Sequence, residues 1–361
     1  MAVLAIVAAV AAMFAATPYL IGAVAVRYGV SEGTSGLLSA VQVGAFATMT
    51  LTLPRLVTPS TGKLRVAAAV FLAANLVSIA MWWFPLLVAV RAVAGAAAGT
   101  LTWMVWREAM SARRAMASIS SVGPLSVLIA APLLAYLSGF GDRAVYAVLA
   151  VASIPGLFAA VGEATTPAAR RIVSRSRSNR VLLGALFLLT FAGAGMFVYE
   201  SVAAVEVLGL TTLQTSLGFS LNAAGGLLGA RLAGRHKRPG WWLASAGPAI
   251  FLTIGSGTPW LFFPAMAWWG FAFWMGVPGV LQMIAARSLH PAERAGDTQG
   301  FMAIGRAVGP FMGGFFTDAG AFTALAAVAG TGVSLSGAVV IGVQEGRERL
   351  PPTTPLKPAG P

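Results

Sequence analysis

Cysteine, histidine and charged residues are scarce in this sequence of 361 residues. The absence of cysteine excludes disulfides, thiol nucleophiles and thiolate metal sites. With only two histidines, His236 and His290, we expect no metal centre and no cofactor. Charged residues make up 10% of the chain and apolar residues 58%, whereas a soluble protein has about 25% charged residues. A soluble fold of this length could not bury so much apolar surface, so we expect the chain to lie in lipid.

Long apolar segments fill most of the sequence, and a helix that crosses a membrane needs roughly 20 such residues. Twelve segments meet this length: 3–25, 34–54, 65–83, 85–105, 118–138, 143–162, 181–203, 211–233, 240–257, 260–285, 298–317 and 320–342. Eleven spans are the alternative, because only residues 82–85 separate the third segment from the fourth. The first segment lacks the basic start of a signal peptide, so we expect it to be retained. The sequence predicts an all-α integral membrane protein of about twelve helices.

Lysine and arginine gather in alternate loops of this predicted arrangement. Of the 24 basic residues, Arg27 and Arg143 lie on one side, Arg91 and Arg306 lie inside spans, and the other twenty lie on the opposite side. Basic loops stay in the cytoplasm, so we expect a multi-pass plasma-membrane protein with both termini cytoplasmic. The same bias explains the net charge of +13 through contact with lipid headgroups, without a nucleic-acid partner.

The sequence also echoes itself at a shift of 180 residues. Tyr19 then aligns with Tyr199, and Gln42 aligns with Asn222. Polar residues inside spans are few, so these matches favour a duplication over coincidence of topology. Two six-helix halves are an architecture of secondary transporters, whose substrate site lies near the midplane between the halves. The predicted division is a first half at 1–162, a cytoplasmic linker at 163–180, a second half at 181–343 and a disordered cytoplasmic tail at 344–361.

Three charged side chains fall inside predicted spans, where such residues are rare and often functional. Arg91 lies beside small residues and can face a wet cavity, although packing or snorkelling to the surface is an alternative. Glu200 lies near the end of the seventh span, and a desolvated glutamate can carry the proton of a proton-coupled transporter. A place at the outer surface is the alternative for Glu200. Arg306 lies about two turns from the end of the eleventh span, so snorkelling competes with a functional role there.

The tenth span is unusually aromatic. Trp268, Phe271 and Gln282 fall on one helical face, and the shift of 180 residues aligns Phe271 with Arg91. Such a wall suits an amphipathic or aromatic substrate. Tryptophans of the interfacial belt, facing lipid, are the alternative.

Four short motifs fit one known family. Arg91 and Gly95 form an arginine–glycine pair in the fourth span, and residues 231–238 form a basic loop with Arg231 and Arg235. Pro132 follows an alanine in the fifth span. Pro310 lies in a glycine-rich stretch of the eleventh span, Gly309-Pro310-Phe311-Met312-Gly313-Gly314. These motifs resemble those of the major facilitator superfamily over nearly the whole chain.

The resemblance implies roles for these residues. In that family the fourth-helix arginine is linked to proton coupling, and helices one, four, seven and ten line a central cavity. It implies gating positions at Arg231, Arg235, Pro132 and Pro310. The acidic residue of the family's loop motif falls on Arg231 and is therefore absent, and the antiporters' Gly-Pro pair is degraded at Pro132.

We therefore expect a proton-coupled antiporter, not an enzyme, that exports a small organic molecule by alternating access and acts as a monomer. Its partners would be the substrate, protons and membrane lipids. Protonation of Glu200, with Arg91 as its charge partner, would bias the two access states. An importer, a uniporter and a membrane-embedded lipid-modifying enzyme using residues 290–297 are the alternatives. The expected substrate-binding residues are Tyr19, Arg91, Tyr199, Trp268, Phe271 and Gln282.

Overall fold

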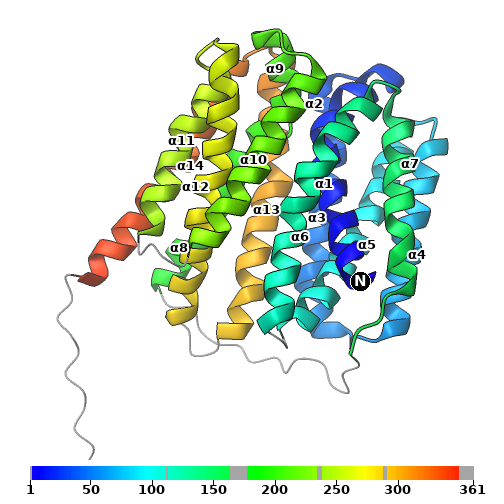
Figure 1. The fold of residues 1–361 in the computed structure, drawn as a ribbon, viewed down its shortest axis with the longest axis horizontal. Coiled ribbons are helices and arrows are strands. Elements are labelled where there is room, and N and C mark those ends of the chain that lie inside the picture. Colours follow the sequence, from blue (N-terminus) through cyan, green and yellow to red (C-terminus); the bar gives the residue numbers. More distant parts are fainter. Residues whose placement is uncertain (1, 111–112, 163–176, 234–237, 288–290, 349–361) are drawn as a thin grey trace, which may run out of the picture.

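The computed structural model describes residues 2–110, 113–162, 177–233, 238–287 and 291–348. These form a helical bundle (Figure 1). The helices are α1 (Ala2–Tyr28), α2 (Glu32–Ser35), α3 (Leu37–Leu56), α4 (Thr61–Ala80), α5 (Phe84–Met110), α6 (Arg113–Ser138), α7 (Asp142–Ser153), α8 (Arg177–Phe197), α9 (Glu200–Leu208), α10 (Thr212–Leu232), α11 (Pro239–Ile254), α12 (Pro259–Ala286), α13 (Pro291–Asp318) and α14 (Phe322–Glu348), with a 3-10 turn η1 (Ile154–Phe158) after α7.

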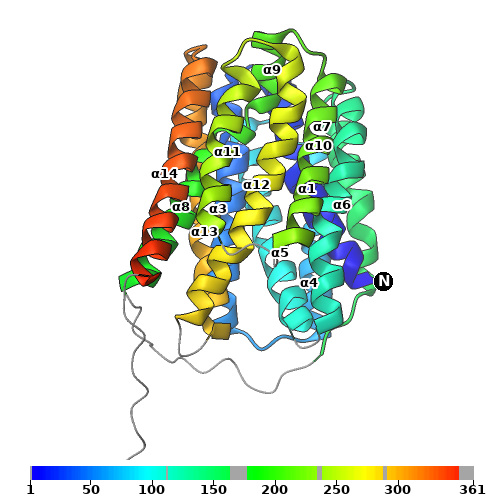
Figure 2. The ribbon, with the colours of Figure 1, turned by 60° about the vertical axis from the view of Figure 1, so that its left-hand side comes forward.

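The predicted all-α membrane fold in two six-helix halves is confirmed, and the helices of the described residues are consistent with about twelve spans. Three spans consist of two consecutive pieces each, namely α2 with α3, α7 with η1, and α8 with α9. Taken singly, seven segments in the described part of the chain are long and apolar enough to cross a membrane. The first half, α1–α7, and the second half, α8–α14, lie side by side in Figure 1. In Figure 2 the second half has come forward, and its helices α10 and α12 lie in front of helices of the first half.

The connections between spans lie at the two ends of the bundle. We call the end where α1 begins and α14 ends the terminal end, and the opposite end, near α2 and α9, the far end (Figure 1). Five far-end connections turn through a glycine with positive φ, which other residues rarely adopt. These glycines are Gly29, Gly141, Gly209, Gly257 and Gly320.

The same helix crossing occurs in both halves. A Cβ on Gly95 of α5 would lie 1.9 Å from the backbone oxygen of Gln42 on α3. A Cβ on Gly270 of α12 would lie 1.9 Å from the backbone oxygen of Asn222 on α10. Only glycine permits such close backbone approach. The polar residues that the internal repeat aligned, Gln42 and Asn222, thus occupy equivalent crossing points.

Two lines of packing join the halves. The α13 helix packs along α3 and α2, and the α10 helix packs along α6. At the second line the Ser220 hydroxyl donates to the backbone oxygen of Leu128 (3.1 Å). The central region between these lines is where a carrier of this architecture would hold its substrate.

Candidate functional site: buried polar groups within and between the halves

Arg91 is enclosed by hydrogen-bond acceptors. Only 1% of its surface is exposed. Its Nε and Nη2 donate to Gln42 Oε1 (2.8 and 2.6 Å), and its Nη1 donates to Asn75 Oδ1 (2.8 Å) and Ser78 Oγ (3.4 Å). The guanidinium carbon lies 5.1 Å from the ring centroid of Tyr146. An arginine buried in this way is stabilised by amide oxygens and by a π face.

All of these partners come from α3, α4 and α7, so Arg91 points into the interior of the first half. Asn75 extends the network by donating to the Ser153 hydroxyl (3.2 Å). None of the hydrogen bonds of Arg91 reaches Glu200, and the predicted charge partnership is therefore not made in this conformation. Arg91 faces neither lipid nor the boundary between the halves.

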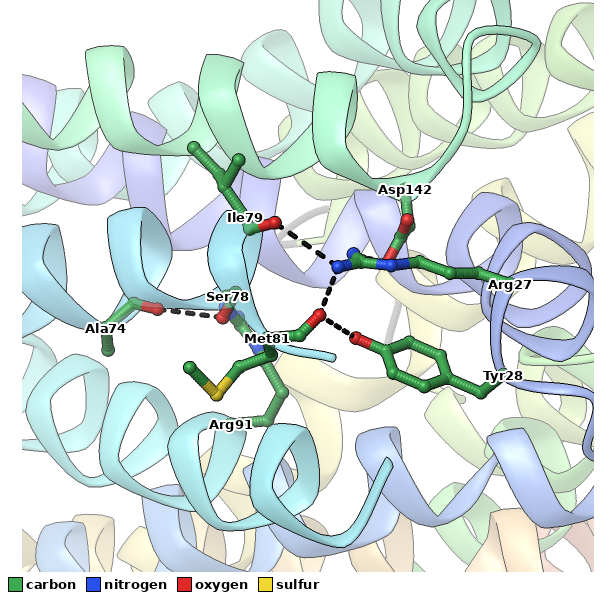
Figure 3. Close-up of polar contacts among 8 residues, drawn as sticks. All are labelled: Arg27, Tyr28, Ala74, Ser78, Ile79, Met81, Arg91 and Asp142. Atoms are coloured by element: carbon green, nitrogen blue, oxygen red, sulfur yellow. Dashed lines mark hydrogen bonds and ion pairs between the residues drawn. The ribbon is translucent and has the colours of Figure 1, made fainter. Parts of the chain in front are cut away.

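A second polar group lies at the far end of the first half (Figure 3). Arg27 Nη1 is 2.8 Å from Asp142 Oδ2, and this is the one ion pair in which both side chains belong to the described part of the structure. Arg27 Nη2 donates to the backbone oxygens of Ile79 (3.3 Å) and Met81, and the Tyr28 hydroxyl also donates to Met81 (2.9 Å). Arg27 thereby joins α1 to the first residue of α7 and satisfies carbonyls at the end of α4. The sequence offered no sign of this role, because Arg27 and Asp142 stand near predicted loops.

We expect Asp142→Asn to lower the free energy of unfolding by about 1–3 kcal/mol. The change leaves the largely buried Arg27 guanidinium without its counter-charge. The measurement is thermal and denaturant unfolding of the purified protein in detergent. Arg143→Gln, at the exposed neighbouring position, is the control and should change stability by less than about 0.5 kcal/mol. Equal stability of the two variants would contradict this role for the Arg27–Asp142 pair.

The seventh span breaks between α8 and α9. Tyr199, at φ −102° and ψ 2°, precedes α9 and is fully buried. Its hydroxyl donates to the backbone oxygen of Pro310 (3.0 Å) and more weakly to that of Gly33 (3.3 Å). Tyr199 thus links the second half to the first at this break.

Glu200 follows Tyr199 and is also fully buried. Neither of its carboxyl oxygens has a hydrogen-bond partner within the described residues. Thr253 of α11 lies beside this carboxyl, but its hydroxyl donates to the backbone oxygen of Ile250 (2.8 Å). Glu200 therefore points into the second half, and it does not reach the outer surface.

An aromatic cluster lies where the halves meet, and we call Tyr19, Phe197, Phe219 and Trp269 the central aromatic cluster. Successive ring centroids are 5.5 Å apart from Tyr19 to Phe219, 5.0 Å from Phe219 to Phe197 and 5.6 Å from Phe197 to Trp269. All three contacts are edge-to-face, the geometry that aromatic quadrupoles favour. The cluster draws on α1, α8, α10 and α12. Of the expected substrate-binding residues, Tyr19 belongs to it.

The other aromatic candidates lie elsewhere. Trp268 is 43% exposed, and its Nε1 donates to the Ser245 hydroxyl of α11 (3.2 Å). Phe271 packs with Trp268 and with Trp242 of α11, at centroid distances of 5.6 and 5.5 Å. Gln282 is exposed. Among the described side chains, no ring contact joins Trp268 or Phe271 to the central aromatic cluster, whereas Trp269, one residue further along, belongs to it.

The expected gating residues are spread along the bundle. Arg231 is exposed near the end of α10, and Arg235 lies outside the described residues. Pro132 lies within α6, and Pro310 lies within α13, where its backbone oxygen accepts the Tyr199 hydroxyl. Side chains of residues 290–297, on which the enzyme alternative depended, also lie outside the described part.

Contacts between the halves close the far end, and we call Ser31, Gly33, Gly36, Tyr199 and Asp318 the far-end seal. Asp318, the last residue of α13, accepts the Gly33 amide at Oδ1 (2.8 Å) and the Ser31 hydroxyl at Oδ2 (3.0 Å). It therefore caps the start of α2 in the other half. Sequence reasoning missed this contact, because Gly33 and Asp318 are 285 residues apart.

Two packed six-helix halves, with charged groups buried inside apolar helices, are an architecture of membrane transporters. The family model of the Major Facilitator Superfamily matches residues 2–314, and the chain belongs to this superfamily. No curated protein sequence matches the chain significantly.

Solved structures share the fold over almost their whole length. A bacterial homologue of the human lysosomal transporter Spinster, in an inward-facing and occupied conformation, has a TM-score of 0.69 and 12% identity, covering 95% of this chain and 94% of its own. The nucleoside transporter NupG has a TM-score of 0.70 and 12% identity, covering 94% and 98%. The human organic anion transporter MFSD10 (TETRAN) has a TM-score of 0.66 and 16% identity, covering 94% and 97%.

Proposed function

We propose that this chain is a proton-coupled secondary transporter that exports a small organic molecule by alternating access. The observation that carries the proposal is the complete burial of the Glu200 carboxyl without a hydrogen-bond partner in the described part of the chain. An ionised carboxylate in such a place would cost several kcal/mol, so this conformation favours the neutral, protonated acid. A conformation that hydrates Glu200 would release the proton.

The position of Glu200 links this proton to the far-end seal. Its neighbour Tyr199 donates to backbone oxygens of both halves, at Pro310 and Gly33. A shift of the break between α8 and α9 would therefore move the Glu200 carboxyl and the Tyr199 contact together. Proton binding and closure of the far end would stabilise the same state, which is the requirement for coupling.

The orientation that we propose identifies the side to which this conformation opens. Because basic loops favour the cytoplasm, we assign the terminal end to the cytoplasm, and a closed far end then corresponds to an inward-facing state. Labelling of a tag added after residue 361 in intact and permeabilised cells tests this orientation. Labelling in intact cells would place the terminal end outside the cell and make this conformation outward-facing.

Removal of the Glu200 proton site should abolish proton coupling. In proteoliposomes, Glu200→Gln should reduce the rate of transport driven by a pH gradient at least about tenfold, because glutamine cannot bind and release a proton. Exchange of substrate without a gradient should persist. The transported substrate is first sought in a panel of organic acids, bases and neutral compounds. The infrared spectrum of Glu200→Gln should lack one protonated-carboxyl band that the wild-type spectrum contains.

Glu345→Gln is the matched control, because Glu345 is exposed near the end of α14. This variant should retain both the coupling and the infrared band. Transport by Glu200→Gln with an undiminished dependence on the pH gradient would refute the coupling role. A wild-type protein that transports without any such dependence would be a uniporter.

A further inference from the structure

The α13 helix presents three faces, and the first two are covered by other helices. A Cβ on Gly305 would lie 2.3 Å from the Thr190 hydroxyl of α8, so residue 305 faces the second half. The Ala307 methyl group lies 3.9 Å from the Cβ position of Gly44 on α3, so residue 307 faces the first half. The third face carries exposed apolar residues and is the lipid side of α13: Ile304, Val308, Phe311 and Phe315.

Arg306 points away from that lipid side. Successive residues of a helix are about 100° apart, so residue 306 bisects the directions of Gly305 and Ala307. The bisecting direction enters the gap between α3 and α8, opposite Ile304 and Val308. Snorkelling along the lipid side, the alternative that the sequence left open, does not fit this direction. Arg306 therefore faces the central region between the halves.

The surroundings of Arg306 differ from those of Arg91. Arg91 is saturated by Gln42, Asn75 and Ser78. Arg306 is partly exposed, and among the described residues no hydrogen bond or ion pair of its guanidinium is found. A guanidinium within a membrane helix needs water or an anion, and its planar fork binds carboxylate, sulfonate or phosphate oxygens in pairs.

The central aromatic cluster lies beyond Arg306 in the direction of the far end. Gly305 is level with residues 187–191 of α8, and Trp269 packs beside Gly193 and Phe197. This difference corresponds to about 6–12 Å along the helix axis. Thr190 and Phe197 are seven residues apart and thus share one face of α8. The partly exposed Phe197 ring therefore lies on the same side as Arg306.

We propose that Arg306 binds the acidic group of an organic anion, whose apolar or aromatic body lies against Phe197 and Trp269. The inference names the substrate class of the transporter proposed above and rests on that function for its site between the halves. The acidic group would lie nearer the terminal end and the apolar body nearer the far end. Arg306 would thus select the charge, and the aromatic rings would select the shape.

Thiol labelling tests the direction of Arg306 without any ligand. The chain has no cysteine, so each variant carries a single thiol. Arg306→Cys should react in proteoliposomes with a membrane-impermeant, charged methanethiosulfonate. Ile304→Cys and Val308→Cys, on the lipid side, should react only with an apolar maleimide. A lack of reaction at Arg306→Cys, or equal reaction at all three positions, would overturn the inference.

Binding to the purified full chain tests the ligand class. 2-Naphthoate and 2-naphthalenesulfonate should bind at least about tenfold more tightly than neutral 2-naphthamide, a factor that corresponds to about 1.4 kcal/mol. Arg306→Gln should reduce naphthoate to the affinity of naphthamide, and Arg306→Lys should retain part of the preference. Arg143→Gln removes an exposed charge at the far end and should leave all affinities unchanged.

Equal affinity for naphthoate and naphthamide, no binding of either acid, or full affinity in Arg306→Gln would refute the proposal. These measurements use no membrane gradient and therefore separate the two claims. Selective acid binding without transport driven by a pH gradient would refute proton coupling and support the Arg306 site. Transport of neutral compounds alone, driven by a pH gradient, would support proton coupling and refute the Arg306 site.

Discussion

Replacement of Gly36 by alanine is expected to keep the far end open and to reduce transport at least about tenfold. A Cβ at this position would lie 1.8 Å from the Tyr199 hydroxyl and 2.8 Å from the ring carbon that bears it. Tyr199 cannot retreat freely, because it is fully buried and its hydroxyl donates to the backbone oxygen of Pro310 (3.0 Å). Overpacking of this kind costs about 1–3 kcal/mol. Because the contact exists only when the far end is closed, the substitution destabilises the closed state relative to the open one.

The substitution should leave the fold intact. Gly36 has φ −60° and ψ −19°, which alanine adopts without strain. The added methyl group therefore acts through the contact between the halves and not through the conformation of its own helix. Purified Gly36→Ala should keep its helical content and elute as the wild type does.

Cross-linking measures closure directly, because the chain has no thiol of its own. The Ser31 hydroxyl and Asp318 Oδ2 are 3.0 Å apart, so Ser31→Cys with Asp318→Cys should react with a short bifunctional thiol reagent. Adding Gly36→Ala should slow this cross-linking reaction at least about tenfold, because the closed state is populated less by the same factor that reduces transport. Gly184→Ala is the control, because a Cβ there meets no atom within 4 Å. Transport and cross-linking at wild-type rates in Gly36→Ala would contradict a sealed far end.

The fold was largely predictable from local properties of the sequence. Apolar length and the alternation of basic loops need no knowledge of tertiary contacts. The burial of Arg91 and Glu200 was one of two interpretations that the sequence allowed: charged residues within apolar spans seldom face lipid, but residues near the end of a span can reach the surface. The break before Glu200 was not predictable, because residues 197–200 contain neither glycine nor proline to indicate it.

The site was less predictable, because it depends on which helices pack against each face. Trp268 and Trp269 are adjacent in the sequence, yet one lies against α11 and the other in the central aromatic cluster. The seal between Gly33 and Asp318 needs two helix ends that only the folded chain brings together. The partners of Arg91 lie on three helices, so the sequence could not distinguish a saturated arginine from one that awaits a substrate.

Gln42→Leu is expected to destabilise the protein by about 3–5 kcal/mol. Gln42 Oε1 accepts from both Nε and Nη2 of Arg91, which has 1% of its surface exposed. Leucine would leave a buried charged group without these acceptors, and hydrogen bonds to charged groups contribute about 1.5–3 kcal/mol each. Denaturant unfolding in detergent measures the loss. Gln282→Leu is the same substitution at an exposed position and should change stability by less than about 0.5 kcal/mol.

The double variant Gln42→Leu with Arg91→Met should recover most of this loss, because it removes the charge together with its acceptor. A buried polar pair replaced by apolar residues of similar volume often costs little. Additive losses in the double variant would show that Arg91 and Gln42 stabilise the fold independently. A transport assay of the double variant then distinguishes a structural role of Arg91 from a role in transport. A stable double variant that still transports would make Arg91 a structural residue and leave Arg306 as the cation of the site. A stable double variant that no longer transports would support the substrate or proton role that the sequence assigned to Arg91.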